Sequence, residues 1–184
     1  MARIVGVAGS LRTGSFNAAL LRAAAGLVPP GSEVEIASIV GIPLYDADVE
    51  RERGIPETVT ALKDRIAAAD GLLLVTPEYN HSIPGVFKNA IDWLSRPPKD
   101  RARVFGDRPV AIMGATDGQG GTRLAQAAWL PVLRTLGTRP WFGKQLYVVD
   151  APHVFDTEGR LVDEKVKKSL SAFMEGFVDF VTGP

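Results

Sequence analysis

The chain has 184 residues, of which 46% are hydrophobic, and its 21 Lys and Arg balance 21 Asp and Glu. This length is typical of one domain with a substantial core, and the zero net charge gives no general electrostatic reason to bind nucleic acid or an anionic membrane. The absence of cysteine excludes disulfides, thiolate nucleophiles, iron–sulfur clusters and cysteine-based zinc sites. Two histidines, His81 and His153, are too few for a histidine-rich metal centre, so we expect no metal site.

The N-terminus leads directly into an apolar, strand-like run without the charged and then apolar layout of a signal peptide. No apolar run approaches the roughly 18 residues that cross a bilayer. The sequence therefore predicts a soluble, cytoplasmic, globular protein.

In the first part of the chain, apolar runs rich in β-branched residues alternate with segments of helical period. Residues 4–8 are nearly all apolar, which is typical of a strand buried on both faces. A helix is expected over residues 17–28 and a second strand over residues 34–39. Residues 43–54 form a predicted acidic loop, and a proline opens the next helix, at residues 56–70.

The second part of the chain repeats this alternation, and its clearest strand is residues 71–76. Further strands are expected at 109–114 and 145–149, and further helices at 84–94, 122–136 and 163–181. Strands that alternate with helices form a parallel sheet with helices on both faces, because each parallel crossover needs a connecting helix. We therefore predict one doubly wound α/β domain spanning residues 1–184.

In such sheets ligands bind beyond the carboxyl ends of the strands, where the strand order reverses. Three loops that follow predicted strands are unusual in composition and are candidates for this role. They comprise residues 9–17, 77–85 and 114–121.

The first of these loops, residues 9–17, is rich in Gly, Ser and Thr and leads into a helix. Its main-chain N–H groups, its hydroxyls and the positive charge of Arg12 are typical of a phosphate site. Ser15 rather than lysine follows Gly14, which disfavours a Walker loop, and the glycine spacing disfavours an NAD-binding Rossmann fingerprint. The loop suits a terminal monophosphate better than a pyrophosphate. The alternative is that Ser15 or Asn17 only caps the helix.

The second loop contains two prolines, which hold it rigid and lower the cost of presenting its groups to a ligand. Tyr79 offers an aromatic face, and main-chain groups of residues 78–80 are expected to hydrogen-bond the edge of a flat heterocycle. The alternative is a simple β–α turn with Pro84 at the first helical position.

Two motifs, GSLRTGSFN at residues 9–17 and TPEYNHSIPGVFKNAIDWLSR at residues 76–96, resemble the NADPH-dependent FMN reductase family. This family includes bacterial quinone and chromate reductases. The resemblance covers essentially the whole chain, and the two motifs at successive strand ends are more specific than either one alone. It implies a flavodoxin-like fold of three layers, with a five-stranded parallel sheet in the order 2-1-3-4-5 and helices on both faces.

The resemblance also assigns residues to the cofactor FMN. The FMN phosphate would be held by Ser10, Arg12, Ser15, Phe16 and Asn17. The edge and face of the isoalloxazine ring would be held by Pro77, Glu78, Tyr79 and Asn80. The third loop would wrap the far side of the ring through Thr116, Asp117 and Gly118.

The third loop departs from the family pattern. Many family members carry serine-type hydroxyls here, whereas this chain has an acidic Asp117. A carboxylate near a phosphate is unfavourable, so this residue is expected to alter how an anionic flavin or NADPH is received. The alternative is a glycine-rich turn with Asp117 in solvent.

The resemblance implies an FMN-dependent NAD(P)H oxidoreductase. NADPH or NADH would pass a hydride to flavin N5 and leave, and a quinone or another electron-poor acceptor would then be reduced in a ping-pong reaction. Chromate, azo compounds and free flavin are further candidate acceptors. The flavin carries the chemistry, so no side chain is assigned a catalytic role, and the choice between NADH and NADPH stays open.

The alternative function is a flavodoxin-type electron carrier, which would bind FMN without using NAD(P)H directly. Such carriers tend to be strongly acidic, and the balanced charge of this chain argues against that class. A phosphoacceptor receiver domain needs paired acids after the first strand, where this chain has Gly9 and Ser10.

Five further residues are candidates for secondary roles. Lys88 and Arg123 are candidate cations near reduced flavin, and His81 is interpreted as a solvated loop residue. Trp93 and Trp129 are expected in the core, with a subunit interface as the alternative. Members of the resembled family form dimers or tetramers, so a homodimer or homotetramer is expected.

Overall fold

A computed structural model describes residues 1–183 of the chain. Its strands are β1 (Arg3–Ala8), β2 (Glu33–Ala37), β3 (Gly71–Val75), β4 (Pro109–Ala115), β5 (Arg139–Pro140) and β6 (Tyr147–Val148). Its helices are α1 (Phe16–Gly26), α2 (Ala47–Arg53), α3 (Glu57–Ala67), α4 (Gly85–Leu94), the 3-10 turn η1 (Pro98–Asp100), α5 (Arg101–Phe105), α6 (Arg123–Leu136), α7 (Ala151–Val154) and α8 (Glu164–Thr182). Within residues 1–183, no helix is both long enough and apolar enough to span a bilayer.

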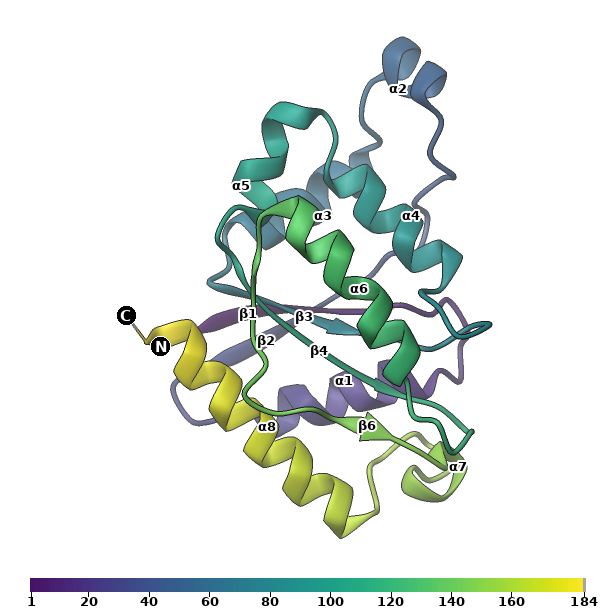
Figure 1. Cartoon of the computed structure of the whole chain (residues 1–184), viewed down its shortest axis with the longest axis vertical. Helices are drawn as coiled ribbons and strands as arrows, with labels where there is room; N and C mark the ends of the chain where they lie inside the picture. Colours follow the sequence, from purple (N-terminus) through teal and green to yellow (C-terminus); the bar gives the residue numbers. More distant parts are fainter. Residues whose placement is uncertain (184) are drawn as a thin grey trace.

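The sheet is parallel and lies between two layers of helices (Figure 1). Its strand order is β2-β1-β3-β4-β5, and β6 also pairs with β4. Helices α1 and α8 cover one face, and α3, α4 and α6 cover the other. The predicted three-layer α/β fold and the order 2-1-3-4-5 are confirmed, with one additional short strand.

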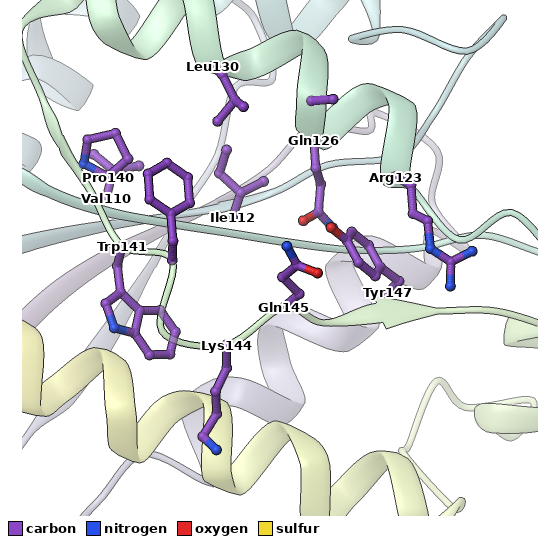
Figure 2. A pocket seen from close by; sticks show the side chains of 12 residues that line it. Val110, Ile112, Arg123, Gln126, Leu130, Pro140, Trp141, Lys144, Gln145 and Tyr147 are labelled. Atoms are coloured by element: carbon purple, nitrogen blue, oxygen red, sulfur yellow. The ribbon is translucent and has the colours of Figure 1, made fainter.

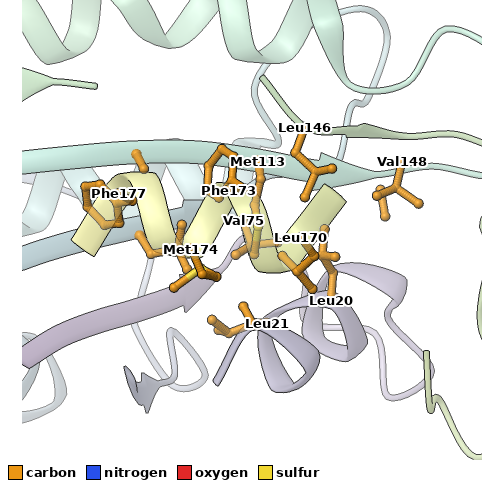
Figure 3. Packing of buried hydrophobic residues seen from close by; sticks show 14 of the residues in the cluster. Leu20, Leu21, Val75, Met113, Leu146, Val148, Leu170, Phe173, Met174 and Phe177 are labelled. Atoms are coloured by element: carbon orange, nitrogen blue, oxygen red, sulfur yellow. The ribbon is translucent and has the colours of Figure 1, made fainter. Parts of the chain in front are cut away.

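The central strand β3 is a continuous apolar run because both of its faces are buried. Leu72 and Leu74 point into the core on the α3, α4 and α6 side, whereas Leu73 and Val75 point into the opposite core. Figure 3 shows the latter core, in which side chains of α1 and α8 surround Val75 and Met113. Both faces are buried because successive side chains of a strand alternate between them.

The strand predicted at residues 145–149 is wrong in its extent. The edge of β4 pairs first with Arg139–Pro140 and then with Tyr147–Val148, and the residues between them leave the sheet. Neither segment is longer than two residues, so neither has the alternating pattern that identifies a strand in a sequence.

The predicted loop at residues 43–54 contains the short helix α2, which protrudes at the top of Figure 1. Asp46 caps its first turn, and Glu50 accepts hydrogen bonds from Tyr45 Oη at 2.9 Å and Arg96 Nε at 2.8 Å. The hydrogen bond from Arg96 lowers the pKa of Glu50, so this carboxylate stays ionised at neutral pH. Helix α2 buries no residue, so the apolar period that marks a helix is absent from its sequence.

Trp93 and Trp129 are both completely buried. Trp93 Nε1 donates to the carbonyl oxygen of Pro43 at 2.9 Å, and Trp129 packs edge to face on Phe87 with 5.0 Å between ring centroids. The prediction that they belong to the core is confirmed, and neither is available to anchor a subunit interface.

Candidate cofactor-binding site

The three candidate loops meet because β1, β3 and β4 are adjacent and end at the same edge of the sheet. Hydrogen bonds continue the strand pairing into the loops, from Gly9 N to Val75 O and from Thr76 N to Met113 O, both at 2.9 Å. Gly9 lies against the ring of Phe87, which occupies the position that a Cβ would need. This contact explains the glycine immediately after β1.

The first loop presents free hydrogen-bond donors at the N-terminus of α1. Ser15 caps the helix, since its Oγ accepts from Ala18 N at 3.2 Å. The main-chain N–H groups of Phe16 and Asn17 have no partner within residues 1–183. The guanidinium of Arg12 lies over the ring of Phe16, 5.2 Å from its centroid, and forms no ion pair with any described residue. Free N–H groups, a helix dipole and an unpaired guanidinium fit a phosphate.

The second loop is a tight hairpin. Tyr79 and Ser82 exchange main-chain hydrogen bonds at 3.2 and 3.0 Å, and both residues between them, Asn80 and His81, have positive φ angles of 50° and 60°. Positive φ at both central positions is the geometry of a type I′ turn, which asparagine tolerates better than most residues. The hairpin presents a half-exposed Tyr79 ring, but the N–H of Tyr79 is already used, so the expected edge contacts from this residue's N–H are not available.

The carboxylate of Glu78 contacts helix α6. Its Oε2 accepts from Ala125 N at 2.9 Å, while Thr122, at the start of α6, makes no side-chain cap. Glu78 therefore caps a helix that begins more than forty positions later in the chain, and it connects the second loop to the third. Its side chain is therefore engaged within the protein, and the contact predicted for the flavin edge falls to its main-chain groups.

Asn17 makes a similar connection between the first and third loops. Its Nδ2 donates to Ala115 O at 2.8 Å, and its Oδ1 accepts from Ala115 N at 2.9 Å. The side chain is 4% exposed, so this pair is buried and both ends of the amide are used. The main-chain N–H of Asn17, rather than its side chain, is the group that faces the anion site.

The loops enclose a cavity of about 480 Å³. It is lined by Ser10, Arg12, Ser15, Phe16, Asn17, Pro77, Glu78, Tyr79, Ala115, Thr116 and Asp117. Ten of the twelve residues assigned from the sequence thus come together, whereas Asn80 and Gly118 lie outside this lining. Ala115 was missed, because an alanine that acts through its main chain carries no sequence signal.

The other candidate residues lie around this cavity rather than in it. Lys88 pairs with Asp92 at 2.7 Å, and the Arg123 guanidinium lies over the ring of Tyr147 at 5.1 Å. The exposed His81 has its Nδ1 3.3 Å from Oε1 of Glu78. His153 Nδ1 lies 2.7 Å from Oδ1 of Asp150, a partner that the sequence did not indicate.

A parallel sheet in this order, with a phosphate-type site and an aromatic platform beside the β1–β3 switch point, defines a mononucleotide-binding α/β protein. The family model described as NADPH-dependent FMN reductase matches residues 2–153, and the chain belongs to this family.

Individual relatives extend this match over nearly the full chain. The chain is 46% identical over 168 residues to an NAD(P)H-dependent FMN reductase of Pseudomonas aeruginosa, covering 91% of this chain and 89% of the relative. It is 40% identical over 179 residues to a 2-hydroxy-1,4-benzoquinone reductase of a Burkholderia species, covering 97% and 96%. Among solved structures, an NAD(P)H:(acceptor) oxidoreductase of Paracoccus denitrificans superposes with a TM-score of 0.87 at 34% identity, covering 98% and 97%.

Proposed function

We propose that the protein is an FMN-dependent NAD(P)H oxidoreductase that reduces quinones. In the balanced reaction, NAD(P)H, a proton and a quinone give NAD(P)⁺ and a hydroquinone. Bound FMN supplies the redox chemistry by holding the two electrons between the two half-reactions, which predicts ping-pong kinetics.

The unpaired charge of Arg12 beside the free N–H groups of Phe16 and Asn17 is the observation that carries this proposal. These three donors line the same cavity, Ser15 already caps the helix, and a helix N-terminus with an adjacent cation favours an anionic ligand. The terminal phosphate of FMN is such a ligand, and Tyr79 lines the same cavity where the ring would extend.

The protein's own contribution is to orient the cofactor. Asn17 and Glu78 hold the third loop against the first and second, so the walls of the cavity are in place before a ligand binds. No side chain in the lining is required as an acid or base, in keeping with a site whose only cation is Arg12.

The names of the relatives favour this enzyme over a flavodoxin-type carrier, because they describe reductases that use NAD(P)H. Quinones are the acceptors that we propose first, because relatives from Burkholderia and Escherichia coli are quinone reductases. Azo compounds, free flavin and, with lower efficiency than neutral quinones, chromate are further proposed acceptors. We also propose a cytoplasmic location, which the use of NAD(P)H supports. We propose a single domain, because the two hydrophobic cores pack on opposite faces of one sheet.

The visible spectrum of the purified protein tests the proposal. We expect flavin bands that bleach on anaerobic addition of NADPH or NADH and return with 1,4-benzoquinone. Bands that bleach with dithionite but with neither nicotinamide would support the carrier instead. A protein that cannot be loaded with FMN would contradict both functions.

We also propose a homodimer or homotetramer, supported by an apolar surface along the edge of β4. Between β5 and β6, Ile112 has no strand partner on its outer side, and a cavity of about 220 Å³ lies there. Figure 2 shows Leu130 next to Ile112 and Trp141 farther along the same cavity, toward α8, and the exposed Phe142 belongs to the same cavity. Unpaired edges and apolar patches of this kind are typical of interfaces.

Sedimentation velocity measures this assembly directly. We expect a species of at least twice 19.7 kDa for the wild type, and smaller species for Leu130→Glu, since a charge on α6 would be buried in the interface. A wild-type monomer at micromolar concentration would contradict the proposal.

A further inference from the structure

The charges that line the FMN cavity are unevenly distributed. Arg12 is its single cation, whereas Glu78 and Asp117 are both carboxylates. Glu78 is turned toward the N-terminus of α6, where the helix dipole and Ala125 N–H partly offset its charge. Asp117 is exposed and forms no ion pair with any residue in 1–183, so solvent rather than a protein group offsets its charge.

The carboxylate of Asp117 is nevertheless held in place. Thr116 Oγ1 donates to Asp117 Oδ1 at 3.2 Å and accepts from Gly118 N at 3.3 Å. This turn belongs to the third loop. Asn17 holds the start of that loop through two hydrogen bonds to Ala115. The carboxylate therefore lies within a turn whose base is anchored, and it lines the cavity.

Within residues 1–183, the two other candidate cations have partners away from this wall of the cavity. Lys88 is committed to Asp92, and Arg123 contacts Gly120 O at 3.1 Å and the ring of Tyr147 instead of the cavity. His81 lies beside Glu78 on the exposed hairpin. When the FMN phosphate, with about two negative charges, occupies the single guanidinium of Arg12, the loaded cleft has a net negative charge.

We propose that Asp117 makes this cleft select neutral electron acceptors over anionic ones, so that uncharged quinones are substrates and sulfonated quinones and oxyanions such as chromate are disfavoured. The inference rests on the proposed function, because it concerns the acceptor that follows NAD(P)H into the cleft. A unit charge several ångströms away in a partly hydrated site changes an affinity by about threefold to tenfold.

A matched pair of acceptors isolates the effect of charge. 1,2-Naphthoquinone and its 4-sulfonate both take two electrons and two protons, but the sulfonate carries one negative charge. We expect Asp117→Asn to raise the ratio of kcat/KM for the sulfonate over that for the neutral quinone by about threefold to tenfold at low salt. The gain should shrink in 0.5 M salt, at which a Debye length of about 4 Å screens the cleft.

Asp179→Asn is the matched control, because Asp179 is exposed in the last turn of α8 and does not line the FMN cavity. The C-terminal end of α8 lies beside the start of the chain, at the opposite edge of the sheet from the carboxyl ends of the strands (Figure 1). Asp179→Asn should leave the ratio unchanged. An unchanged ratio in Asp117→Asn, or an equal rise in Asp179→Asn, would overturn the proposal.

The reduction potential of the bound FMN gives a readout that does not depend on turnover. Removing a nearby negative charge favours the more negative, reduced flavin, so Asp117→Asn should raise the midpoint potential against a reference dye. A tenfold change in the reduction equilibrium corresponds to about 30 mV for two electrons. A wild type that holds FMN but does not oxidise NAD(P)H would contradict the proposed function alone, and the potential would still decide the role of Asp117. An unchanged potential would also overturn the proposal, because the charge of Asp117 would then not act on the bound flavin.

Discussion

We expect Arg12→Ala to weaken FMN binding by about 10- to 100-fold, since a hydrogen bond to a charged group contributes about 1.5–3 kcal/mol. The affinity for riboflavin, which has the same ring system but no phosphate, should change little. Arg12 is exposed and is the single cation in the cavity lining, so its removal should cost little folding stability. Fluorescence quenching of each flavin on titration with apoprotein measures both affinities.

Arg22→Ala is the control for this result. Arg22 belongs to α1, which follows the loop that carries Arg12, and it lines a neighbouring cavity rather than the one that contains Arg12. It should leave the preference for FMN over riboflavin intact. Equal losses of FMN and riboflavin affinity in Arg12→Ala would mean that Arg12 acts on the shape of the loop and not on the phosphate.

The second large effect is expected for Asn17→Ala. This change removes both hydrogen bonds to Ala115 and leaves a buried N–H and a buried C=O without partners. Each unsatisfied group costs about 1–3 kcal/mol, so we expect the free energy of unfolding of the apoprotein to fall by about 2–4 kcal/mol. Urea unfolding followed by circular dichroism measures this loss, and FMN affinity should fall with it because the third loop is no longer held.

Asn80→Gly is the matched control, because Asn80 is exposed and has a φ of 50°, a conformation that glycine adopts without strain. It should leave the free energy of unfolding within about 0.5 kcal/mol of the wild type. A loss below about 1 kcal/mol for Asn17→Ala would contradict a buried clamp.

Long elements with a strong hydrophobic pattern could be predicted from the sequence. The run Gly71–Val75 is buried on both faces and α8 has a continuous apolar side, so each shows a recognisable hydrophobic pattern over several residues. Helix α2 and strand β5 show no such pattern, because α2 buries no residue and β5 has only two residues. Their conformations depend on partners such as Arg96 and β4, which are distant in the sequence.

The position of the site could also be predicted, because parallel strands bring their carboxyl ends, and therefore the loops after β1, β3 and β4, to one edge of the sheet. Residue types in those loops indicated an anion site and a flat-ring platform. The orientation of individual side chains was not predictable in the same way. Asn17 and Glu78 were both assigned to the cofactor, yet their side chains bind main-chain groups of Ala115 and Ala125.

Composition and hydrophobic period were thus sufficient to predict the α/β fold class, because that class follows from local patterns and from the general geometry of parallel sheets. The strand order and the cofactor expected at the strand ends came from the family resemblance that the two loop motifs carry. The tertiary structure decided which site residues contact the protein itself. It places Asn17 beside Ala115, 98 positions away, and Glu78 beside Ala125, 47 positions away. A buried amide or carboxylate is bound by whichever donors the packed chain brings to it, and that choice is not encoded in neighbouring residues.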